Sequence, residues 1–439
     1  MDPRVNVAVA SGAWTGGLGG YYFDDLIAVR SGAEPDGLLY EGDPVTRGHD
    51  RIRNPGRTVL TVLVDGDGCM GFGDAAAIQY SGVVGRDPVL DPDTLGPQVD
   101  VAISELATAG SLDFSEACQL LESLTMPNGR RLHTGIRYGL SQAFLQLVAI
   151  HHRLSMAEAL RVTYKLEMPK RVPIFAQSGE ERYRNVDKMI LKEADALPHG
   201  LINSPPLFGS RGSALLDYVS WVRQRVRDVG RTEYAPTLHF DIYGLAGFEF
   251  GIRSDRLTAY CDSLQRAASP YKLRLETPVD GGSALETARA LAKLRRSNSA
   301  AGVEVALVAD DWCNTSSDVE MFLELEAVDM VQIKTPDLGA LENTLRAAQT
   351  CQAAGVGAFV GGTCNETDIS ARACVHVAAA VGADLMYAKP GMGVDEGLMI
   401  VRNELGRIEI QARMMALSRQ AWFMDRRALE SSEAWGERW

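Results

Sequence analysis

Short apolar runs separated by helix-length segments dominate the chain from about residue 170 onward. Each run ends in a polar or charged residue, followed by Gly, Pro or another residue that breaks regular structure. The runs are VPIFAQ, KMILKEAD, TLHFDIYG, YKLRLETP, VEVALVADD, MVQIKTPD, GAFVGGT and LMYAKPG. The central ones recur at intervals of about 35 residues, which is the length of one strand, one helix and two loops.

Roughly eight such units predict a (β/α)8 TIM-type barrel over residues 169–412. The helices between them are expected at SDRLTAYCDSLQRAA, ALETARALAKLRR, SDVEMFLEL and LENTLRAAQTCQAA. A doubly wound open sheet is the alternative fold for alternating strands and helices. It gains no support, because no Gly-x-Gly-x-x-Gly motif follows a strand as a dinucleotide site would require.

The first part of the chain has a different pattern, in which a hairpin precedes several helices. RTVLTVLV and CMGFGD flank the sequence Asp-Gly-Asp-Gly at 65–68, whose residues tolerate positive φ. DVAISELATA, SLDFSEACQLLESL and LHTGIRYGLSQAFLQLVAIHHRL follow with helical periodicity, the second capped by Asp113 or Ser111. Residues 1–168 are therefore expected to form an α+β capping domain, and residues 413–439 a C-terminal helix and tail.

Composition narrows the classes of function. The 439 residues carry a formal net charge of -13 and lack the clustered Lys and Arg that bind phosphate, so no nucleic-acid partner is expected. No apolar stretch reaches the roughly 18 residues of a membrane span, and the N-terminus has no secretory pattern. The seven cysteines form no Cys-x-x-Cys pair, which is typical of reduced thiols in the cytoplasm. Small-molecule chemistry in the cytoplasm is the expectation.

The run MVQIKTPD places a lysine in what should be a buried strand. Alternate side chains of a strand point to opposite faces, so Gln332 and Lys334 would point into the barrel while Ile333 packs outward on the helices. Lys334 would then lie near the C-terminal end of its strand, where barrel enzymes carry their catalytic groups.

Three acidic residues, Asp241, Glu276 and Asp310, end three consecutive predicted strands. Close carboxylates repel each other unless they are protonated or bridged by a cation. A hard divalent ion with oxygen ligands, most simply Mg²⁺, would bridge them. For any one acid alone, capping of the next helix or pairing with an arginine is the better interpretation. Three acids at consecutive strand ends, followed by a buried lysine, favour a metal site.

Long segments of the chain resemble the methylaspartate ammonia-lyase family of the enolase superfamily. The resemblance runs nearly end to end, through YYFDD, AIQYSGVVGRDP, NGRRLHTGIRYG, AQSGEERYRNVDKMILKEADALPHGLIN, HFDIYG, LVADDWCNT, MVQIKTPDLG, GGTCNET and AKPGMGVDEG. It implies a capping domain on a barrel, a homodimer, and Mg²⁺ with K⁺ as a monovalent activator. The implied reaction removes the C3 proton of L-threo-3-methylaspartate, or a close 3-substituted aspartate, and eliminates ammonia to give mesaconate.

The resemblance also assigns roles position by position. Asp241, Glu276 and Asp310 match the metal ligands, and Lys334 matches the base that removes the C3 proton. His199, which the residues alone leave open between a core histidine and a catalyst, matches the base on the opposite face. The positions that hold the substrate's carboxylates and amino group are Gln79, Gln177, Gln332, Thr363 and Cys364.

The implied chemistry makes demands on Lys334. A proton beside a carboxylate is very weakly acidic, because its removal adds a second negative charge to that carboxylate. A metal ion at the carboxylate would stabilise this charge. Lys334 must be neutral to accept the proton, and burial together with a nearby dication is expected to lower its pKa.

Two positions depart from the family. Tyr387 stands where the family usually has leucine, and Phe359 where it commonly has tyrosine; both positions border the substrate's alkyl group in the family. The C3 substituent could therefore be absent, polar or differently oriented. Alternatively, the hydroxyl moves from one wall to the other and the methyl group is kept. Lys192 is expected to be structural, and Lys389 to be a charged neighbour of the site.

Two other functions stay open from the sequence. One is another enolase-superfamily reaction, such as dehydration or racemisation of a carboxylate, neither of which releases ammonia. The other is a non-enzymatic binding or scaffolding protein stabilised by a metal. The complete set of catalytic positions disfavours the second.

Overall fold

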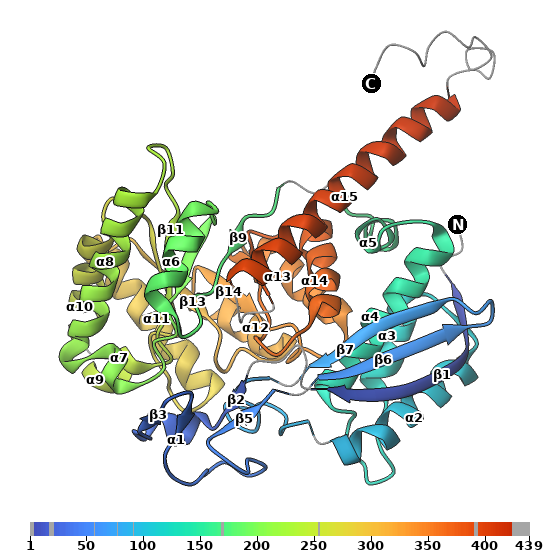
Figure 1. The fold of residues 1–439 in the computed structure, drawn as a ribbon, viewed down its shortest axis with the longest axis horizontal. Coiled ribbons are helices and arrows are strands. Elements are labelled where there is room, and N and C mark those ends of the chain that lie inside the picture. The colour runs from blue at the N-terminus through green and yellow to red at the C-terminus, as the bar shows by residue number, and fades with distance from the viewer. Residues whose placement is uncertain are drawn as a thin grey trace.

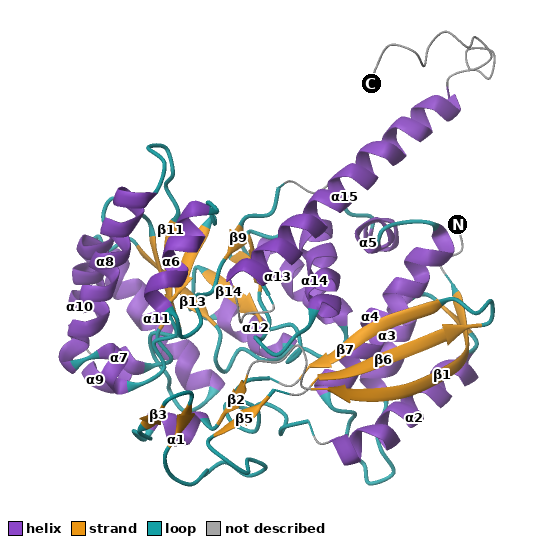
Figure 2. Ribbon diagram, in the orientation of Figure 1, coloured by secondary structure: helices purple, strands orange, loops and turns teal. Residues whose placement is uncertain are grey.

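The computed structural model describes residues 4–16, 22–56, 58–76, 78–90, 92–167, 171–252, 255–389 and 394–423. Two parts lie side by side: an N-terminal α+β part, blue to cyan in Figure 1, and a barrel with surrounding helices, green to red. Figure 2 shows the long strands of the N-terminal part as one open sheet with helices behind it. The fold expected from the sequence is confirmed.

The N-terminal sheet is antiparallel, with strand order β7-β6-β1-β8. Its strands are β1 (Val5–Gly16), β6 (Thr58–Asp65), β7 (Met70–Ala76) and β8 (Ser111–Leu112). The predicted hairpin is confirmed as β6 and β7. Asp65 holds the turn, because its Oδ1 accepts hydrogen bonds from the backbone N–H groups of Asp67 and Cys69, both at 2.9 Å.

One face of this sheet is covered by α4 at very short range. A Cβ atom on Gly71 or Gly73 would lie within about 2 Å of the carbonyl oxygens of Ala143 or Gly139 in the helix, so only glycine fits there. The helices of this part are α2 (Pro92–Ala109), α3 (Phe114–Ser123), α4 (Thr134–His152) and α5 (Met156–Tyr164). Asp113 caps α3 in a capping box with Glu116. Of the two predicted caps, Asp113 and Ser111, the first is confirmed.

Smaller elements of the N-terminal part lie beside the barrel, at the bottom of Figure 1. They are β2 (Tyr22–Asp24), α1 (Leu26–Arg30), β3 (Pro35–Asp36), β4 (Leu39–Tyr40) and β5 (Arg53–Pro55). Arginines tie this region to the barrel loops. Arg53 donates to Glu180 at 2.6 Å, and Arg30 donates to Asp280 at 2.8 Å.

The barrel is closed by parallel strands in the order β10-β11-β12-β13-β14-β15-β16-β9. Its strands are β9 (Ile174–Phe175), β10 (Ala196–His199), β11 (Thr237–Asp241), β12 (Leu273–Glu276), β13 (Val305–Ala309), β14 (Met330–Ile333), β15 (Gly357–Val360) and β16 (Leu385–Tyr387). Its helices are α6 (Arg182–Leu191), α7 (Pro205–Phe208), η1 (Ser210–Gly212), α8 (Ser213–Val229), α9 (Leu245–Phe250), α10 (Asp255–Ala268), α11 (Ala284–Ala301), α12 (Ser316–Glu324), α13 (Leu341–Ala353), α14 (Asp368–Val381) and α15 (Val394–Phe423).

One predicted strand of the barrel is wrong. The first half of the run KMILKEAD, residues 188–191, forms the end of α6, and the second strand is β10, the stretch Ala-Leu-Pro-His that follows the run. Val186, Met189 and Ile190 are buried at helical spacing, with charged residues between them. This spacing has the helical period of 3.6 residues, which cannot be recognised within a short apolar run. The correction puts His199 at the end of a barrel strand.

The barrel interior below its mouth is filled by a separate apolar cluster. Its members are Phe175, Ala196, Val308, Met330, Phe359, Leu385 and Tyr387. The strands are thus held from inside by packed side chains, as in other small barrels. Polar side chains lie above this layer.

The end of the barrel differs in detail from the expected domain limits. Helix α15 continues without a break across residues 412 and 413, and residues 424–439 of the expected tail lie outside the described residues. His376 of α14 contacts Glu404 of α15 at 3.0 Å, which fixes the two helices together. Among helices of the described ranges, none combines the length and apolar character of a membrane span.

Candidate active site

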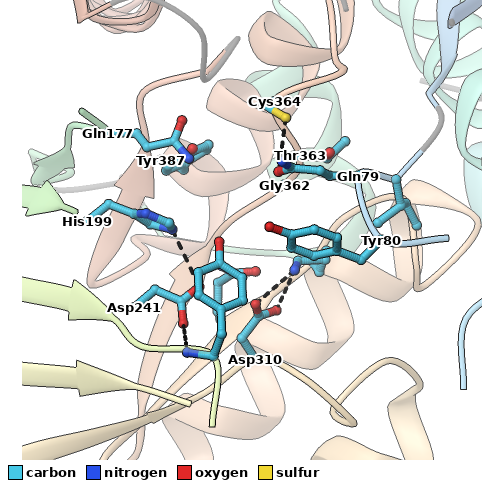
Figure 3. Close-up of a pocket in the computed structure, with 14 residues that line it drawn as sticks. Gln79, Tyr80, Gln177, His199, Asp241, Asp310, Gly362, Thr363, Cys364 and Tyr387 are labelled. Atoms are coloured by element: carbon cyan, nitrogen blue, oxygen red, sulfur yellow. Dashed lines mark hydrogen bonds and ion pairs between the residues drawn. The ribbon is translucent and has the colours of Figure 1, made fainter. Parts of the chain in front are cut away.

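A pocket lies at the C-terminal mouth of the barrel, between the strand ends and residues 78–80 of the N-terminal part. Its lining residues are Ile78, Gln79, Tyr80, Gln177, His199, Asp241, Tyr243, Asp310, Gln332, Lys334, Gly362, Thr363, Cys364 and Tyr387. Figure 3 shows His199, Gln177 and Tyr387 on one side, and Tyr80, Gln79, Thr363 and Cys364 on the other. Most of the residues predicted from the sequence therefore meet at one site.

Asp241 and Glu276 are fully buried neighbours at the ends of β11 and β12. Ligand-type atoms of His199, Asp241 and Glu276 all lie within 4.8 Å of one another. Burial raises the pKa of both carboxyls well above their usual range, and their mutual repulsion and that of Asp310 add to the shift. Such carboxylates are stabilised by a bound cation, and their oxygens suit Mg²⁺. The residues at this site fit a magnesium ion.

Neutral groups bond to Glu276. The imidazole Nε2 of His239 lies 2.7 Å from one carboxylate oxygen, and Gln332 Nε2 donates to the other, also at 2.7 Å. His239 stacks on Phe175 with ring centroids 4.3 Å apart. Burial lowers the pKa of His239 well below its ordinary value, so the ring is neutral. His239 was not predicted as a site residue, although strand alternation places it on the same face as Asp241.

Lys334 points into the pocket and forms an ion pair with Asp310. Its Nζ lies 2.7 Å from Oδ1 and 2.8 Å from Oδ2 of the carboxylate. Burial acts to lower the pKa of Lys334, but the negative charge of Asp310 outweighs it, and the pKa lies above its ordinary value. Burial therefore acts in the predicted direction, and the effect of a bound dication on this pKa stays a prediction.

His199 lies on the other side of Asp241. Its Nε2 is 3.6 Å from Asp241 Oδ2, and its Nδ1 accepts a hydrogen bond from the backbone N–H of Leu201 at 3.3 Å. Burial, assisted by the positive charge of Lys334, lowers the pKa of His199 to about 3. The ring is therefore neutral near pH 7, which is the form that can accept a proton.

Two buried amides have polar atoms free to contact a substrate. Gln79 Nε2 and Gln332 Oε1 have no hydrogen-bond partner among the described residues. Gln79 Oε1 accepts a hydrogen bond from the thiol of Cys364 at 3.3 Å. Burial raises the pKa of Cys364 to about 12, so the thiol keeps its proton and can hold the amide with its N–H group free.

The two residues expected beside the alkyl group lie at different depths. Tyr387 lines the pocket, whereas Phe359 does not. The Phe359 ring is fully buried in the apolar layer below, with its centroid 6.3 Å from that of Tyr387 and 5.5 Å from that of Phe175. The position of Phe359 beside the substrate's alkyl group stays a prediction, since its ring lies in the layer below the pocket lining.

Sequence reasoning missed Arg86, which comes from the N-terminal part and is buried among acidic residues of the barrel. Its guanidinium donates to Asp337 at 2.8 Å and to Asp311 at 3.0 Å, and it lies 3.8 Å from Asp310. The only available signal was the resemblance of its segment, VVGRDP, to the family. Lys192 pairs with Asp395 on the outside of the barrel, where a structural role was expected.

Comparison with known proteins agrees across both parts of the chain. The family models for the methylaspartate ammonia-lyase N-terminus and C-terminus match residues 8–165 and 167–414. Methylaspartate ammonia-lyase 2 of Carboxydothermus hydrogenoformans is 44% identical over 394 residues, which cover 89% of this chain and 95% of the relative.

Two solved structures are similar over nearly their whole length. The magnesium complex of β-methylaspartase from Clostridium tetanomorphum has a TM-score of 0.85 and 43% identity, covering 93% of this chain and 100% of that one. The Citrobacter amalonaticus methylaspartate ammonia lyase containing (2S,3S)-3-methylaspartic acid has a TM-score of 0.86 and 39% identity, covering 94% and 100%. The chain belongs to the methylaspartate ammonia-lyase family.

Proposed function

We propose that the chain is a carbon–nitrogen lyase that removes ammonia from L-threo-3-methylaspartate, or a close 3-substituted aspartate, to give mesaconate or its analogue. The observation that carries the proposal is the pairing of buried carboxylates with a buried lysine in one small pocket. Family membership over both parts supports it. The related enzyme that contains (2S,3S)-3-methylaspartic acid holds this same stereoisomer.

Asp241, Glu276 and Asp310 are the proposed ligands of Mg²⁺. A bound magnesium ion would supply positive charge beside the substrate carboxylate that becomes more negative when the C3 proton leaves. The magnesium complex of the relative from Clostridium tetanomorphum supports this choice of metal. The buried carboxylates of Asp241 and Glu276, unpaired among the described residues, support it independently.

Lys334 is the proposed base that takes the C3 proton. Only the neutral amine can accept a proton, and the charge of Asp310 is the main influence that holds the pKa of Lys334 up. Neutralising that carboxylate would leave burial as the dominant influence, which favours the neutral amine. His199, already neutral, is the proposed base for the opposite face and would serve substrates of the other C3 configuration.

The remaining pocket residues would hold the substrate's polar groups. Gln79 Nε2 can donate to a carboxylate, and Gln332 Oε1 can accept from the amino group. Gln177, Thr363 and Cys364 complete this set at the pocket wall. Fixing both carboxylates and the amine orients the C3 proton toward the base and the C2–N bond for cleavage.

Tyr387 is the proposed determinant of the C3 substituent. It lines the pocket, and burial raises the pKa of its phenol well above the ordinary value, so the hydroxyl keeps its proton. The bulky ring limits the space for an alkyl group, while the hydroxyl can bond to a polar one. Activation by K⁺, a homodimeric assembly and a cytoplasmic location are further proposals that rest on the family resemblance.

The test is ammonia release by the purified protein with Mg²⁺, in K⁺ and in Na⁺. L-threo-3-methylaspartate is compared with aspartate and with bulkier or polar 3-substituted aspartates. Fast turnover of methylaspartate would show that Tyr387 is a tolerated change. Turnover of another aspartate alone would identify Tyr387 as the specificity determinant. No ammonia from any of them would overturn the proposal in favour of a dehydratase or racemase.

A further inference from the structure

A second buried charged cluster lies next to the pocket, centred on the carboxylate of Glu366. Lys389 Nζ donates to Glu366 Oε1 at 2.9 Å, and both side chains are fully buried. The hydroxyl of Tyr138 donates to the same oxygen at 2.5 Å. The other oxygen, Oε2, accepts the backbone N–H of Thr363 at 2.8 Å. Both carboxylate oxygens are thus hydrogen-bonded, and two of these three donors, Lys389 and Tyr138, come from other elements of the chain.

These contacts connect the segments after β14, β15 and β16, which contain or directly follow pocket residues. Thr335 follows Lys334 directly, and its hydroxyl accepts a hydrogen bond from Lys389 at 3.1 Å. Lys389 itself comes two residues after Tyr387, and it also donates to the carbonyl of Gly361 at 2.9 Å. Movement of this lysine would therefore disturb the loops after β14, β15 and β16 together.

The loop after β15 lies directly against the ion pair. A Cβ atom on Gly362 would be 2.2 Å from Glu366 Oε2 and 2.5 Å from Lys389 Nζ, and the φ angle of Gly362 is +147°. Any larger residue would push the backbone of Thr363 and Cys364 away from its place in the pocket wall. The Glu366–Lys389 ion pair and Gly362 together determine the position of the pocket wall formed by Thr363 and Cys364.

Tyr138 brings the capping part into the same cluster. It belongs to α4, the helix packed on the N-terminal sheet, and its side chain is completely buried. Burial raises the pKa of the Tyr138 phenol well above its ordinary value, so the hydroxyl stays a donor. Helix α4 is thereby linked, through the Glu366 carboxylate, to the loop that carries Thr363.

We propose that Glu366, Lys389 and Tyr138 form a positioning unit that fixes the substrate-binding loop 361–364 from beneath and links it to the capping domain. None of the three lines the pocket, so they act through Thr363, Cys364 and the neighbouring loops. The inference rests on the proposed function, because it assumes that this loop holds the substrate's carboxylate or amino group.

The test is a comparison of the wild type with Tyr138→Phe, which removes one hydroxyl and keeps the ring. KM for the best aspartate substrate is expected to rise about tenfold, with kcat within about twofold, because the loop binds ground state and transition state alike. The Kd of the unsaturated product, mesaconate, measured by calorimetry, should weaken by the same factor. The double variant Glu366→Gln/Lys389→Met, which leaves no unpaired charge, should show at least the same shift.

Glu404→Gln is the matched control. Its carboxylate is also buried and bonds to His376 and Arg407, but it lies between α14 and α15 and outside the pocket. It should lower the melting temperature without changing KM, kcat or Kd. If Tyr138→Phe and the double variant behave like this control, the positioning role is wrong. A wild type that binds and turns over no aspartate would overturn the proposed function and this inference with it.

Discussion

Two buried charged clusters share the mouth of one barrel, and they differ in their balance of charge. Glu366 is paired with Lys389 and bonded by Tyr138 and Thr363. Asp241 and Glu276, by contrast, contact only neutral groups in the described part of the chain. The first cluster is complete by itself, whereas the second has a surplus of negative charge.

This difference distinguishes a structural cluster from a binding site. A buried carboxylate with a matched cation and full hydrogen bonding gains nothing from a further ligand. Carboxylates whose pKa values are raised by burial and mutual repulsion gain from any cation that reaches them. Removing a carboxylate should therefore have opposite effects on stability in the two clusters.

Lys334→Ala is expected to have the largest effect. Loss of the proposed base should lower kcat about a thousandfold with L-threo-3-methylaspartate, within the range for removal of a general base. Ammonia release measures the loss. The melting temperature is the control. It should stay close to that of the wild type, because Asp310 still has a cation, Arg86, 3.8 Å away. A variant that keeps wild-type kcat would exclude Lys334 as the base.

Glu366→Gln tests the balanced cluster. It leaves the ammonium of Lys389 buried without a charged partner, and the free energy of unfolding should fall by about 3 kcal/mol. Urea denaturation gives the value, and Lys389→Met added to Glu366→Gln should recover most of it. Unchanged stability in the single variant would show that the ion pair does not hold the loops together.

Glu404 offers a balanced cluster remote from the pocket, with a pH signature. Burial acts to raise the pKa of Glu404, but the hydrogen bond and charge of His376, with those of Arg407, outweigh it and hold the pKa at about 2. Because the folded pKa lies below the unfolded value, the carboxylate stabilises the fold above about pH 4.5, and this is lost as pH falls toward 2.

The measurement is the unfolding free energy of the wild type and Glu404→Gln against pH. The two should differ on the order of 2 kcal/mol near pH 7 and converge toward pH 2. A constant difference across this range would contradict the assigned pKa.

Asp241→Asn tests the unbalanced cluster and has the smallest expected effect, but of opposite sign. In EDTA it should raise the unfolding free energy by about 1 kcal/mol, because it relieves repulsion among buried carboxylates. With Mg²⁺, the wild type should gain stability and the variant should gain much less. A variant that is less stable than the wild type in EDTA would show that the negative charge of Asp241 does not destabilise the fold.

The sequence predicted the parts of this site that depend on local periodicity. Strand alternation correctly turned Gln332 and Lys334 into the barrel, and the acids at successive strand ends came together because parallel strands share one C-terminal edge. The second strand was missed because four apolar residues in a short run fit a helix and a strand equally well.

The residues that escaped prediction make contacts across the domain boundary. Arg86 meets Asp311 and Asp337, and Tyr138 meets Glu366, at separations of more than 200 residues along the chain. No spacing rule connects such positions. Lys389 was recognised as a charged neighbour of the site, but its partner and complete burial depend on the fold of three separate loops.

Helix α4 has one face held by glycines of the N-terminal sheet and another that delivers Tyr138 to the barrel. The capping part therefore cannot be exchanged independently of the barrel. A chimera that joined it to a barrel without an acceptor at position 366 would bury a phenolic hydroxyl with one partner missing. Efforts to broaden specificity by swapping caps between relatives must transfer Tyr138 and Glu366 as a pair.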